Sequence, residues 1–422
     1  MRYKKYPSYK DSGVEWLGEI PEEWKIRKFK YLFQIRKRIS GELGFNILSI
    51  TQNGIKIKDI KSGSGQLSSD YSKYQFVYKD DYAMNHMDLL TGFVDLSKYD
   101  GVTSPDYRVF SLIENHSNKD YYLYLLQMGY INKIFYPLGQ GSSEIGRWRL
   151  PTDAFKEFQA PFPPQKEQEN IAKYIKSSLN KIDTLIIKQK RLIELLKEKR
   201  QALISKAVTR GLDDNVEMKD SGVEWLGEIP KGWNNSTLKF QLINLDFRRI
   251  PISASERGDI QGIYPYYGAS GIIDFVENYI FDEMTILIGE DGANLLSKST
   301  PLAFIADGKY WVNNHAHILK PKDKLFNFWT YILNNLDLTP SISGSAQPKL
   351  TAEALGNLTI VFPKSISERI EIANYLDQKT TQIDTLISKS TKAITLLQEK
   401  RTALISSVVT GKIDVRGEYE HT

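Results

Sequence analysis

The sequence of 422 residues contains no cysteine, which excludes disulfide bonds, zinc sites with cysteine ligands and thiol nucleophiles. It has no apolar run close to the roughly 20 residues that span a bilayer, and its polar N-terminus lacks the apolar stretch of a signal peptide. We therefore expect a soluble, cytoplasmic protein. The excess of 56 Lys and Arg over 51 Asp and Glu is too small to indicate nucleic-acid binding by itself.

Sequence signatures of catalysis are missing as well. There is no Gly-x-x-x-x-Gly-Lys-Ser/Thr phosphate loop, no Asn/Asp-Pro-Pro-aromatic signature of amino-methyltransferases and no serine nucleophile elbow. His315 and His317 are expected on one face of a strand, but no third ligand accompanies them, so we predict no metal site. The sequence favours a noncatalytic binding protein, and an enzyme with an unfamiliar site is the alternative.

The chain contains an internal duplication. The segment KDSGVEWLGEIP at residues 10–21 recurs without a change at residues 219–230. A second pair of matching blocks includes IDTLI at residues 182–186 and 383–387. The regions between these blocks show no visible match. The repeated blocks therefore predict a framework common to both halves, and the divergent regions predict a different task for each half.

The second repeated blocks predict two long helices. Prolines precede both, and Gly211 and Gly411 follow them as terminators. Apolar residues recur every seven positions, which is typical of a coiled coil. Since two tandem copies most simply relate by a two-fold axis, we expect an antiparallel pair. The predicted helix-pairing residues are Ile175, Ile182, Leu185, Leu196, Leu203, Leu376, Ile383, Leu386, Leu397 and Leu404.

The divergent regions mix short strand-like runs with turn signals, and each contains one predicted helix, at residues 120–129 and 325–334. We interpret each region as a compact α/β domain, so that the whole chain is an α+β protein. The KDSGVEWLGEIP segments are expected to pack at the ends of the helical hairpin. The predicted organisation is entry segment 1–21, domain 22–160, helix 161–211, linker and entry segment 212–230, domain 231–361, helix 362–411 and tail 412–422.

Each domain has a loop of small residues at an equivalent position near its C-terminal end. Gly and Ser permit a close backbone approach, while Gln, Arg and Lys carry donors that contact base edges and phosphates. Recurrence in two diverged copies favours a contact loop over an ordinary surface loop. The candidate DNA-contacting residues of these loops are Gln140, Gly141, Ser142, Ser143, Arg147 and Arg149, and Ser343, Ser345, Gln347 and Lys349.

Two further features are open to more than one interpretation. Tyr266 and Tyr267 are candidates for contact with nucleic acid, although tyrosines beside Pro265 are also common in surface packing. The first long helix carries 12 Lys and Arg against 5 Asp and Glu over residues 165–210. This excess can face phosphates or an acidic partner, or it can simply be a solvated face.

The residues as a whole resemble the specificity subunits of type I restriction-modification enzymes. The entry motif is similar to theirs, as are the IDTLI and EKR-x-ALIS blocks of the helices, and the match extends along the whole chain. In the second domain, YPYYGASG, IGEDGA and SGSAQP are similar to motifs of their recognition domains, whereas in the first domain the nearest likenesses are SPDY and the loop after Gly141.

This resemblance implies that each domain reads one half of an asymmetric bipartite site in double-stranded DNA. The helical hairpin would set the spacing, about one helical turn between half-site centres, and would dock two methyltransferase subunits. Nuclease-translocase subunits would join for restriction. The family implies S-adenosylmethionine, ATP and Mg on partner subunits and no cofactor on this chain. The alternative is a coiled-coil adaptor that binds proteins and no specific DNA sequence.

Overall fold

The computed structural model describes residues 4–59, 71–113, 117–141, 148–222, 226–344 and 347–418. The chain forms two compact units: Met1–Gln189 with Lys392–Thr422, and Lys190–Thr391. We call them unit 1 and unit 2. Each contains one of the predicted domains together with part of both long helices. In the described residues, no helix is long and apolar enough to cross a membrane.

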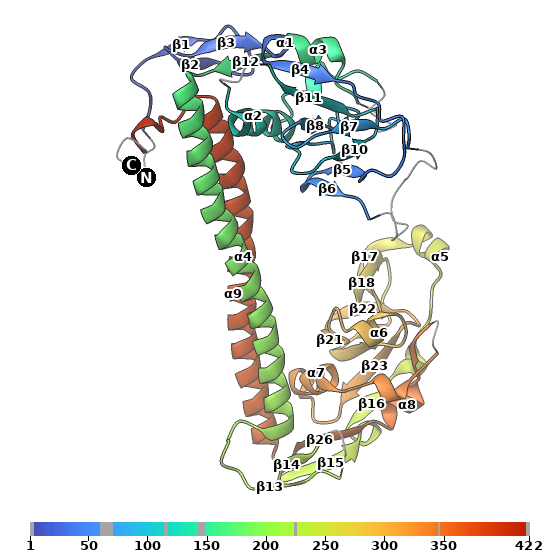
Figure 1. The fold of residues 1–422 in the computed structure, drawn as a ribbon. Helices are drawn as coiled ribbons and strands as arrows, with labels where there is room; N and C mark the ends of the chain where they lie inside the picture. Colours follow the sequence, from blue (N-terminus) through green and yellow to red (C-terminus); the bar gives the residue numbers. More distant parts are fainter. Residues whose placement is uncertain are drawn as a thin grey trace. The chain divides into compact units, whose positions relative to one another are not determined.

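Unit 1 opens with a hairpin and continues into the first domain (Figure 1). Its elements are β1 (Tyr9–Asp11), β2 (Glu19–Pro21), β3 (Lys25–Lys28), α1 (Phe29–Leu32), β4 (Phe33–Arg36), β5 (Leu48–Thr51), β6 (Gly54–Ile57), β7 (Gln75–Val77), β8 (Tyr82–Met84), β9 (Val94–Leu96), β10 (Gly101–Thr103), β11 (Arg108–Leu112), α2 (Lys119–Ile131), η1 (Tyr136–Leu138), α3 (Thr152–Glu157) and β12 (Gln159–Phe162).

Unit 2 repeats this order with additional strands (Figure 1). Its elements are β13 (Met218–Asp220), β14 (Glu228–Pro230), β15 (Trp233–Thr237), η3 (Leu238–Phe240), β16 (Leu242–Asn244), η4 (Asp246–Arg248), α5 (Ala254–Asp259), β17 (Gln261–Gly268), β18 (Gly271–Val276), β19 (Phe281–Asp282), β20 (Thr285–Gly289), α6 (Asn294–Ser297), β21 (Ala303–Ala306), β22 (Lys309–Val312), β23 (Ala316–Pro321), α7 (Phe326–Asn335), η5 (Thr339–Ser341), β24 (Ile342–Ser343), β25 (Lys349–Leu350), α8 (Ala352–Gly356) and β26 (Thr359–Pro363).

Each domain contains its own main sheet of four antiparallel strands, and the two sheets are alike although the domain sequences diverge. The strand order is β4-β11-β8-β9 in the first domain and β16-β23-β20-β21 in the second. Because side chains alternate across a strand, each sheet has two apolar faces. Tyr82 and Phe110 face the larger core of unit 1, while Ala83 and Val109 face a smaller one. The same alternation in unit 2 sends Ile286 and Leu287 to different cores.

The domains differ in the structure behind the main sheet. In the first domain the described strands there are the pairs β7-β10 and β5-β6. In the second domain a four-stranded sheet, β18-β17-β22-β19, lies there, and its β17–β22 contact is parallel. The predicted α/β character and the predicted helices are confirmed, and the difference between the copies is concentrated in this second layer.

The repeated entry segments form matching hairpins, β1-β2 and β13-β14, with the same register. Each is followed by a buried tryptophan, Trp24 or Trp233. Trp24 lies in the core of unit 1 with Ile171 and Val409, at the ends of the long helices. The prediction that this segment packs at the helix ends is confirmed for unit 1. In the second copy, Val223 and Trp225 lie outside the described residues.

The two long helices are α4 (Gln165–Arg210) and α9 (Ile366–Val409), and a short η6 (Arg416–Glu418) follows α9. Pro163, Pro164 and Pro363 precede them. Gly211 and Gly411 follow in the left-handed region, at φ +77° and +75°, where a glycine carries no Cβ penalty. The predicted start and stop signals are therefore confirmed.

The helices pair in an antiparallel sense within each unit. In unit 1 the first half of α4 contributes Ile175 and Ile182 to a core that also holds Leu404 near the end of α9. In unit 2 the end of α4 contributes Ile204 to a core that holds Leu376 near the start of α9. Both contacts join an early part of one helix to a late part of the other, which confirms the predicted orientation.

The predicted helix-pairing residues form two stripes on each helix, a first stripe through Ile182 and Ile383 and a second through Leu185 and Leu386, and only the first lies in the seam. Ile175, Ile182, Leu196, Leu376, Ile383 and Leu404 are buried, and Leu203 and Leu397 are half-buried. Leu185 and Leu386, however, are 46% and 48% exposed, so they do not pair the helices. The seam instead continues through Ile186 and Ile387, four residues after Ile182 and Ile383, and through Ile193 and Ile394, seven residues further on, all of which are half-buried.

The correction follows from helix geometry. At about 100° per residue, a residue three positions on lies on one side of a stripe, and a residue four positions on lies on the other. The isoleucines lie on the inner side in both helices. Their repetition at the same offset in both copies shows that the seam is a shared feature of the duplication.

Candidate nucleic-acid interface

The first predicted loop closes on a single main-chain bridge. The backbone N–H of Gln140 donates to the Arg149 carbonyl at 2.8 Å, and that of Arg149 donates to the Gln140 carbonyl at 3.0 Å. Gly141 has φ +126°, a conformation that favours glycine. A Cβ on Gly139 would lie 2.2 Å from the indole nitrogen of Trp148, so this glycine permits close packing under the loop. Ser142, Ser143 and Arg147 lie outside the described residues.

The second predicted loop is also closed by main-chain pairing, here between two short strands. Strands β24 and β25 pair Ser343 with Lys349, and Gly344 turns the chain at φ +82°. Gln347 is exposed, and Ser345 lies outside the described residues. Both candidate loops therefore begin and end at paired main-chain positions, which are an isolated bridge in the first domain and two short strands in the second.

The base of each loop is held by equivalent main-chain hydrogen bonds. Leu150, one residue after the first bridge, donates its N–H to the His86 carbonyl at 2.9 Å. Leu350, at the end of β25, donates its N–H to the Glu290 carbonyl at 2.8 Å. The pattern fixes the end of the loop to the segment that follows β8 in the first domain and β20 in the second.

In each domain, a buried side chain on an inner strand of the main sheet also contacts the carbonyl of this leucine. Arg108 on β11 donates from Nη2 to the Leu150 carbonyl at 3.0 Å, and His317 on β23 lies with Nε2 2.8 Å from the Leu350 carbonyl. Arg108 pairs across the sheet with Met84, and His317 pairs with Ile288, which are matching positions of β8 and β20. Arg108 and His317 are therefore structurally equivalent.

Arg108 is a buried cation beside an aromatic ring. The side chain is buried, and its guanidinium lies 4.6 Å from the centre of the Phe155 ring. Burial lowers the pKa of Arg108 to about 10, so the group still carries its charge at neutral pH. Burial, together with the charges of Arg108 and Arg149, lowers the pKa of His86 to about 3 and keeps that imidazole neutral. Among the described residues, Arg108 has no ion pair.

The surroundings of His317 contain charges of both signs. Its Nδ1 lies 2.5 Å from Asp246, and the side chain is 1% exposed. Burial alone would lower the pKa of His317, but the hydrogen bonds to Asp246 and Leu350 and the nearby Glu290 raise it. Glu290 in turn accepts Arg249 at 2.7 Å and Lys349 at 3.1 Å, and these contacts lower its pKa against the effect of burial.

Most of the described candidate residues lie where contact with a ligand is possible. Gln140, Gly141, Arg149, Ser343, Gln347 and Lys349 are exposed. Tyr267 is half-buried, with its ring against Tyr310. Tyr266 is fully buried, and its hydroxyl lies 3.3 Å from the Ile252 carbonyl. The prediction that Tyr266 contacts DNA is therefore wrong, because strand β17 turns this side chain inward.

Sequence reasoning missed the residues that hold the loops. The spacing of His315 and His317 indicates only a shared strand face, and no group of potential metal ligands is found in the described residues. His315 pairs with Asp291 at 2.7 Å instead. The partner of His317, Asp246, lies 71 residues away in the sequence, so no local pattern joins them.

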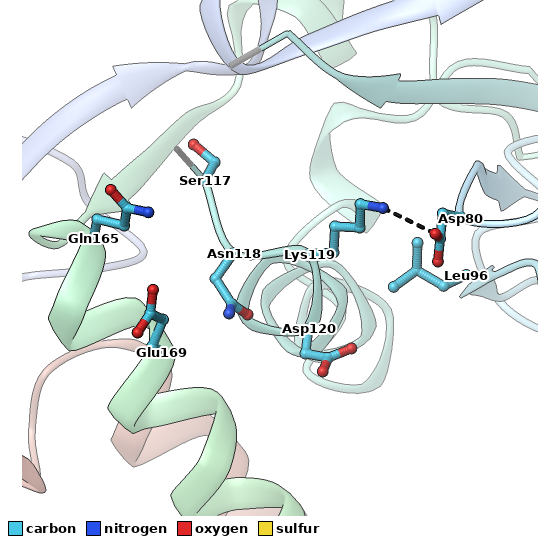
Figure 2. A pocket seen from close by; sticks show the side chains of 8 residues that line it. All are labelled: Asp80, Leu96, Ser117, Asn118, Lys119, Asp120, Gln165 and Glu169. Atoms are coloured by element: carbon cyan, nitrogen blue, oxygen red, sulfur yellow. Dashed lines mark ion pairs between the residues drawn. The ribbon is translucent and has the colours of Figure 1, made fainter. Parts of the chain in front are cut away.

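Hollows adjoin the long helices in both units. One, of about 410 Å³, lies between the start of α2 and the start of α4 in unit 1 (Figure 2). Lys119 there forms an ion pair with Asp80 at 3.0 Å, and Asn118 caps α2. The other, of about 820 Å³, lies in unit 2 between α4, α7 and β21. Tyr331 on α7 donates to Asp377 on α9 at 2.8 Å beside it, which joins the domain to the helix.

Comparisons with known proteins identify one family for both halves of the chain. A family model described as the type I restriction modification DNA specificity domain matches residues 21–197 and 230–396. A putative type I restriction enzyme MjaX specificity subunit from Methanocaldococcus jannaschii is 24% identical over 99% of both chains. The putative specificity subunit S.HindORF215P from Haemophilus influenzae is 36% identical over 39% of each chain.

Solved structures show the same fold at low sequence identity. A chain from a structure of type I R-M complex assembly and conformational transition has a TM-score of 0.70, with 14% identity, and covers 92% of this chain and 98% of its own. The HsdS subunit from Thermoanaerobacter tengcongensis has a TM-score of 0.55, with 14% identity, and covers 93% and 98%. The architecture described above is thus one that has been observed before.

Proposed function

Because this chain belongs to the type I restriction modification DNA specificity family and has two target-recognition domains, we propose that each domain reads one half of an asymmetric, bipartite DNA site. The observation that carries this proposal is the pair of loops after Gln140 and Ser343. They occupy equivalent positions in two domains whose separate main sheets have the same strand order, but their residues differ. Two domains with the same loop position and different contact residues are suited to a DNA site whose two halves differ in sequence.

Affinity in this proposal does not come from the bulk charge of the domains. Residues 22–160 carry 19 Lys and Arg against 16 Asp and Glu, and residues 231–361 carry 11 against 13. Base contacts from the exposed loops would therefore supply specificity, while partner subunits would supply much of the phosphate contact. This division favours a chain that recognises its site as part of a larger complex.

The paired helices are the proposed docking surface for two methyltransferase subunits. The coiled-coil seam is equivalent in both units, so each unit presents the same kind of helical surface. The excess of Lys and Arg on α4 is available to an acidic partner surface or to DNA phosphates. The hairpin would then set the distance between the two half-sites, and nuclease-translocase subunits would join this assembly for restriction.

The chain itself is proposed to be noncatalytic. The chemistry would belong to its partners, with S-adenosylmethionine on the methyltransferase subunits and ATP and Mg on the nuclease-translocase subunits. The adenine to be methylated would be flipped into a partner's pocket. The complex would act in the cytoplasm, where its DNA lies.

Selection of DNA sequences tests this function. The assembled complex of this chain with its methyltransferase would be incubated with a library of random duplexes, and the bound duplexes would be sequenced. The proposal predicts enrichment of two unlike half-motifs at one fixed spacing. An assembled complex that enriches no motif would instead support the coiled-coil adaptor, whose heads bind proteins.

A further inference from the structure

We propose that Arg108 and His317 are equivalent positioning residues for the two recognition loops, and that reading by the second domain alone depends on a proton at this position. The inference rests on the proposed function, because it concerns the loops assigned there to DNA. It goes beyond that function by naming what holds each loop in place. It also predicts that the two halves of one site respond differently to pH.

The positioning role follows from where the two side chains act. Each lies on the central strand of its main sheet and reaches the carbonyl of the leucine that ends the loop, Leu150 or Leu350. The N–H of the same leucine is already fixed to the main chain. The side-chain donor adds a second constraint on this residue, and that constraint orients the peptide from which the loop departs. Neither side chain is exposed enough to contact DNA itself.

The geometry around His317 requires a proton on both ring nitrogens. Nε2 faces the Leu350 carbonyl, which can only accept a hydrogen bond, and Nδ1 faces the Asp246 carboxylate. A neutral imidazole has one donor and one acceptor, so it satisfies only one of these contacts. The imidazolium satisfies both. Asp246 is held for this purpose by the N–H of Ile318 at 2.8 Å and the amide of Asn244 at 3.0 Å.

The other charged groups around His317 reinforce this protonated state. Glu290 lies 3.8 Å from Nδ1, after β20, and Arg249 lies 3.5 Å from Asp246. Lys349 and Arg249 both pair with Glu290. Loss of the His317 proton would therefore leave two buried carboxylates with one cation fewer. It would also place a ring lone pair against either the Asp246 carboxylate or the Leu350 carbonyl at the base of the loop.

Arg108 gives the first loop a donor that does not titrate in the same range. Its charge persists at neutral and mildly alkaline pH, and the neighbouring His86 stays neutral because its pKa is about 3. The first domain therefore serves as an internal control for the pH response of the second domain. An increase in pH through the titration of His317 should weaken the hold on Leu350 and leave that on Leu150 unchanged.

The experiment uses the assembled complex with its methyltransferase and the site found for the wild-type chain. Three duplexes are compared in one reaction: the matched site, a site with a changed first half, and a site with a changed second half. The ratio of methylation rates gives the discrimination for each half, and the pH dependence of the chemical step cancels. Ratios are measured at about pH 6 and about pH 9, on either side of the ordinary histidine range.

The wild-type complex should lose about tenfold or more of its discrimination for the second half at the higher pH, because a hydrogen bond to a charged group is lost. Discrimination for the first half should stay constant. His317→Gln should show the reduced value for the second half at both pH values. His317→Arg, which restores a permanently charged donor, should retain more discrimination than His317→Gln and abolish the pH dependence.

His315→Gln is the matched control, because His315 lies two residues away, is 48% exposed and bonds the Asp291 side chain. Asp291 bridges Lys349 through its main chain, so this substitution removes no donor from the Leu350 carbonyl. It should behave as the wild type. The inference is overturned if wild-type discrimination for both halves responds equally to pH, or if His317→Gln alters both halves to the same extent. If the wild-type complex yields no split site at all, the proposed function fails instead, so the two failures can be told apart.

Discussion

The two recognition domains hold their loops with the same main-chain frame and with different side-chain chemistry. In both, a leucine after the loop is fixed to the segment that follows a central strand. In the first domain an arginine completes the anchor beside a neutral histidine, and in the second a histidine completes it among four charged residues. Main-chain hydrogen bonds tolerate almost any sequence, so the frame persists while the side chains around it diverge.

The long helices behave differently, since their repeated blocks keep side chains as well as backbone in both copies. Arg200 contacts Asp384 at 3.1 Å in unit 2, and Arg401 contacts Asp183 at 3.6 Å in unit 1. Arg401 is the repeat equivalent of Arg200, and Asp183 is that of Asp384. The arginine therefore comes from α4 in one pair and from α9 in the other. The scaffold is therefore constrained in sequence where the recognition domains are not.

The largest expected effect concerns the tryptophans that the two copies share. Trp24 and Trp233 are at most 1% exposed, and replacing either by Ala should reduce the free energy of unfolding by about 3–5 kcal/mol. The loss should be confined to the unit that holds the tryptophan. Hydrogen exchange followed residue by residue would locate it, with the half-buried Trp16 replaced by Ala as the milder comparison. Equal deprotection of both units by Trp24→Ala would contradict the separation into two units.

A second prediction sharpens the comparison of the helix stripes. Ile383→Ala should cost about 2–5 kcal/mol, because Ile383 is buried in the seam. Leu386→Ala should cost about 0.5 kcal/mol or less, because this side chain faces outward. Urea unfolding of the full chain measures both. Ile182→Ala and Leu185→Ala should reproduce the contrast on α4, and similar costs for both members of a pair would restore the rejected stripe.

A third prediction separates the two loops. Gln140→Ala and Gln347→Ala should each relax the specificity for one base in one half of the site, by about 1–3 kcal/mol, if the amide contacts a base edge. The other half should be read as before. Competition binding with singly substituted duplexes gives the result. Unchanged preference in both halves, with the complex intact, would remove these glutamines from the interface.

The smallest effect is expected at the exchanged ion pairs. Both pairs are largely exposed, with side-chain exposures of 34% and 53% for Arg200 and Asp384 and 37% and 51% for Arg401 and Asp183. Double-mutant cycles to Ala should therefore give coupling energies of about 0.2–1 kcal/mol. The shorter Arg200–Asp384 pair should give the larger value at low salt. A coupling of several kcal/mol in either pair would show that the helices depend on charge and not on the apolar seam.

The duplication, the long helices and their orientation could be predicted because identical blocks and seven-residue spacing are local patterns. The error in the second stripe was avoidable, since Ile186, Ile193, Ile387 and Ile394 also repeat every seven residues in both copies. The loops were found from their composition and matching position. The similar main sheets of the two domains could not be predicted, because their strands are short and pair segments that are distant in the sequence. Tyr266 was misjudged for a related reason, as its inward orientation depends on the second sheet of its own domain.

Exchange of one domain tests the central claim most directly. Residues 231–361 would be replaced by the second recognition domain of another family member, and methylated adenines would be mapped in DNA from cells that express the chain with its methyltransferase. The account predicts a split motif in which one half changes while the other half and the spacing stay the same. A motif that changes in both halves, or no motif from a complex that assembles, would contradict the reading of one half-site by each domain.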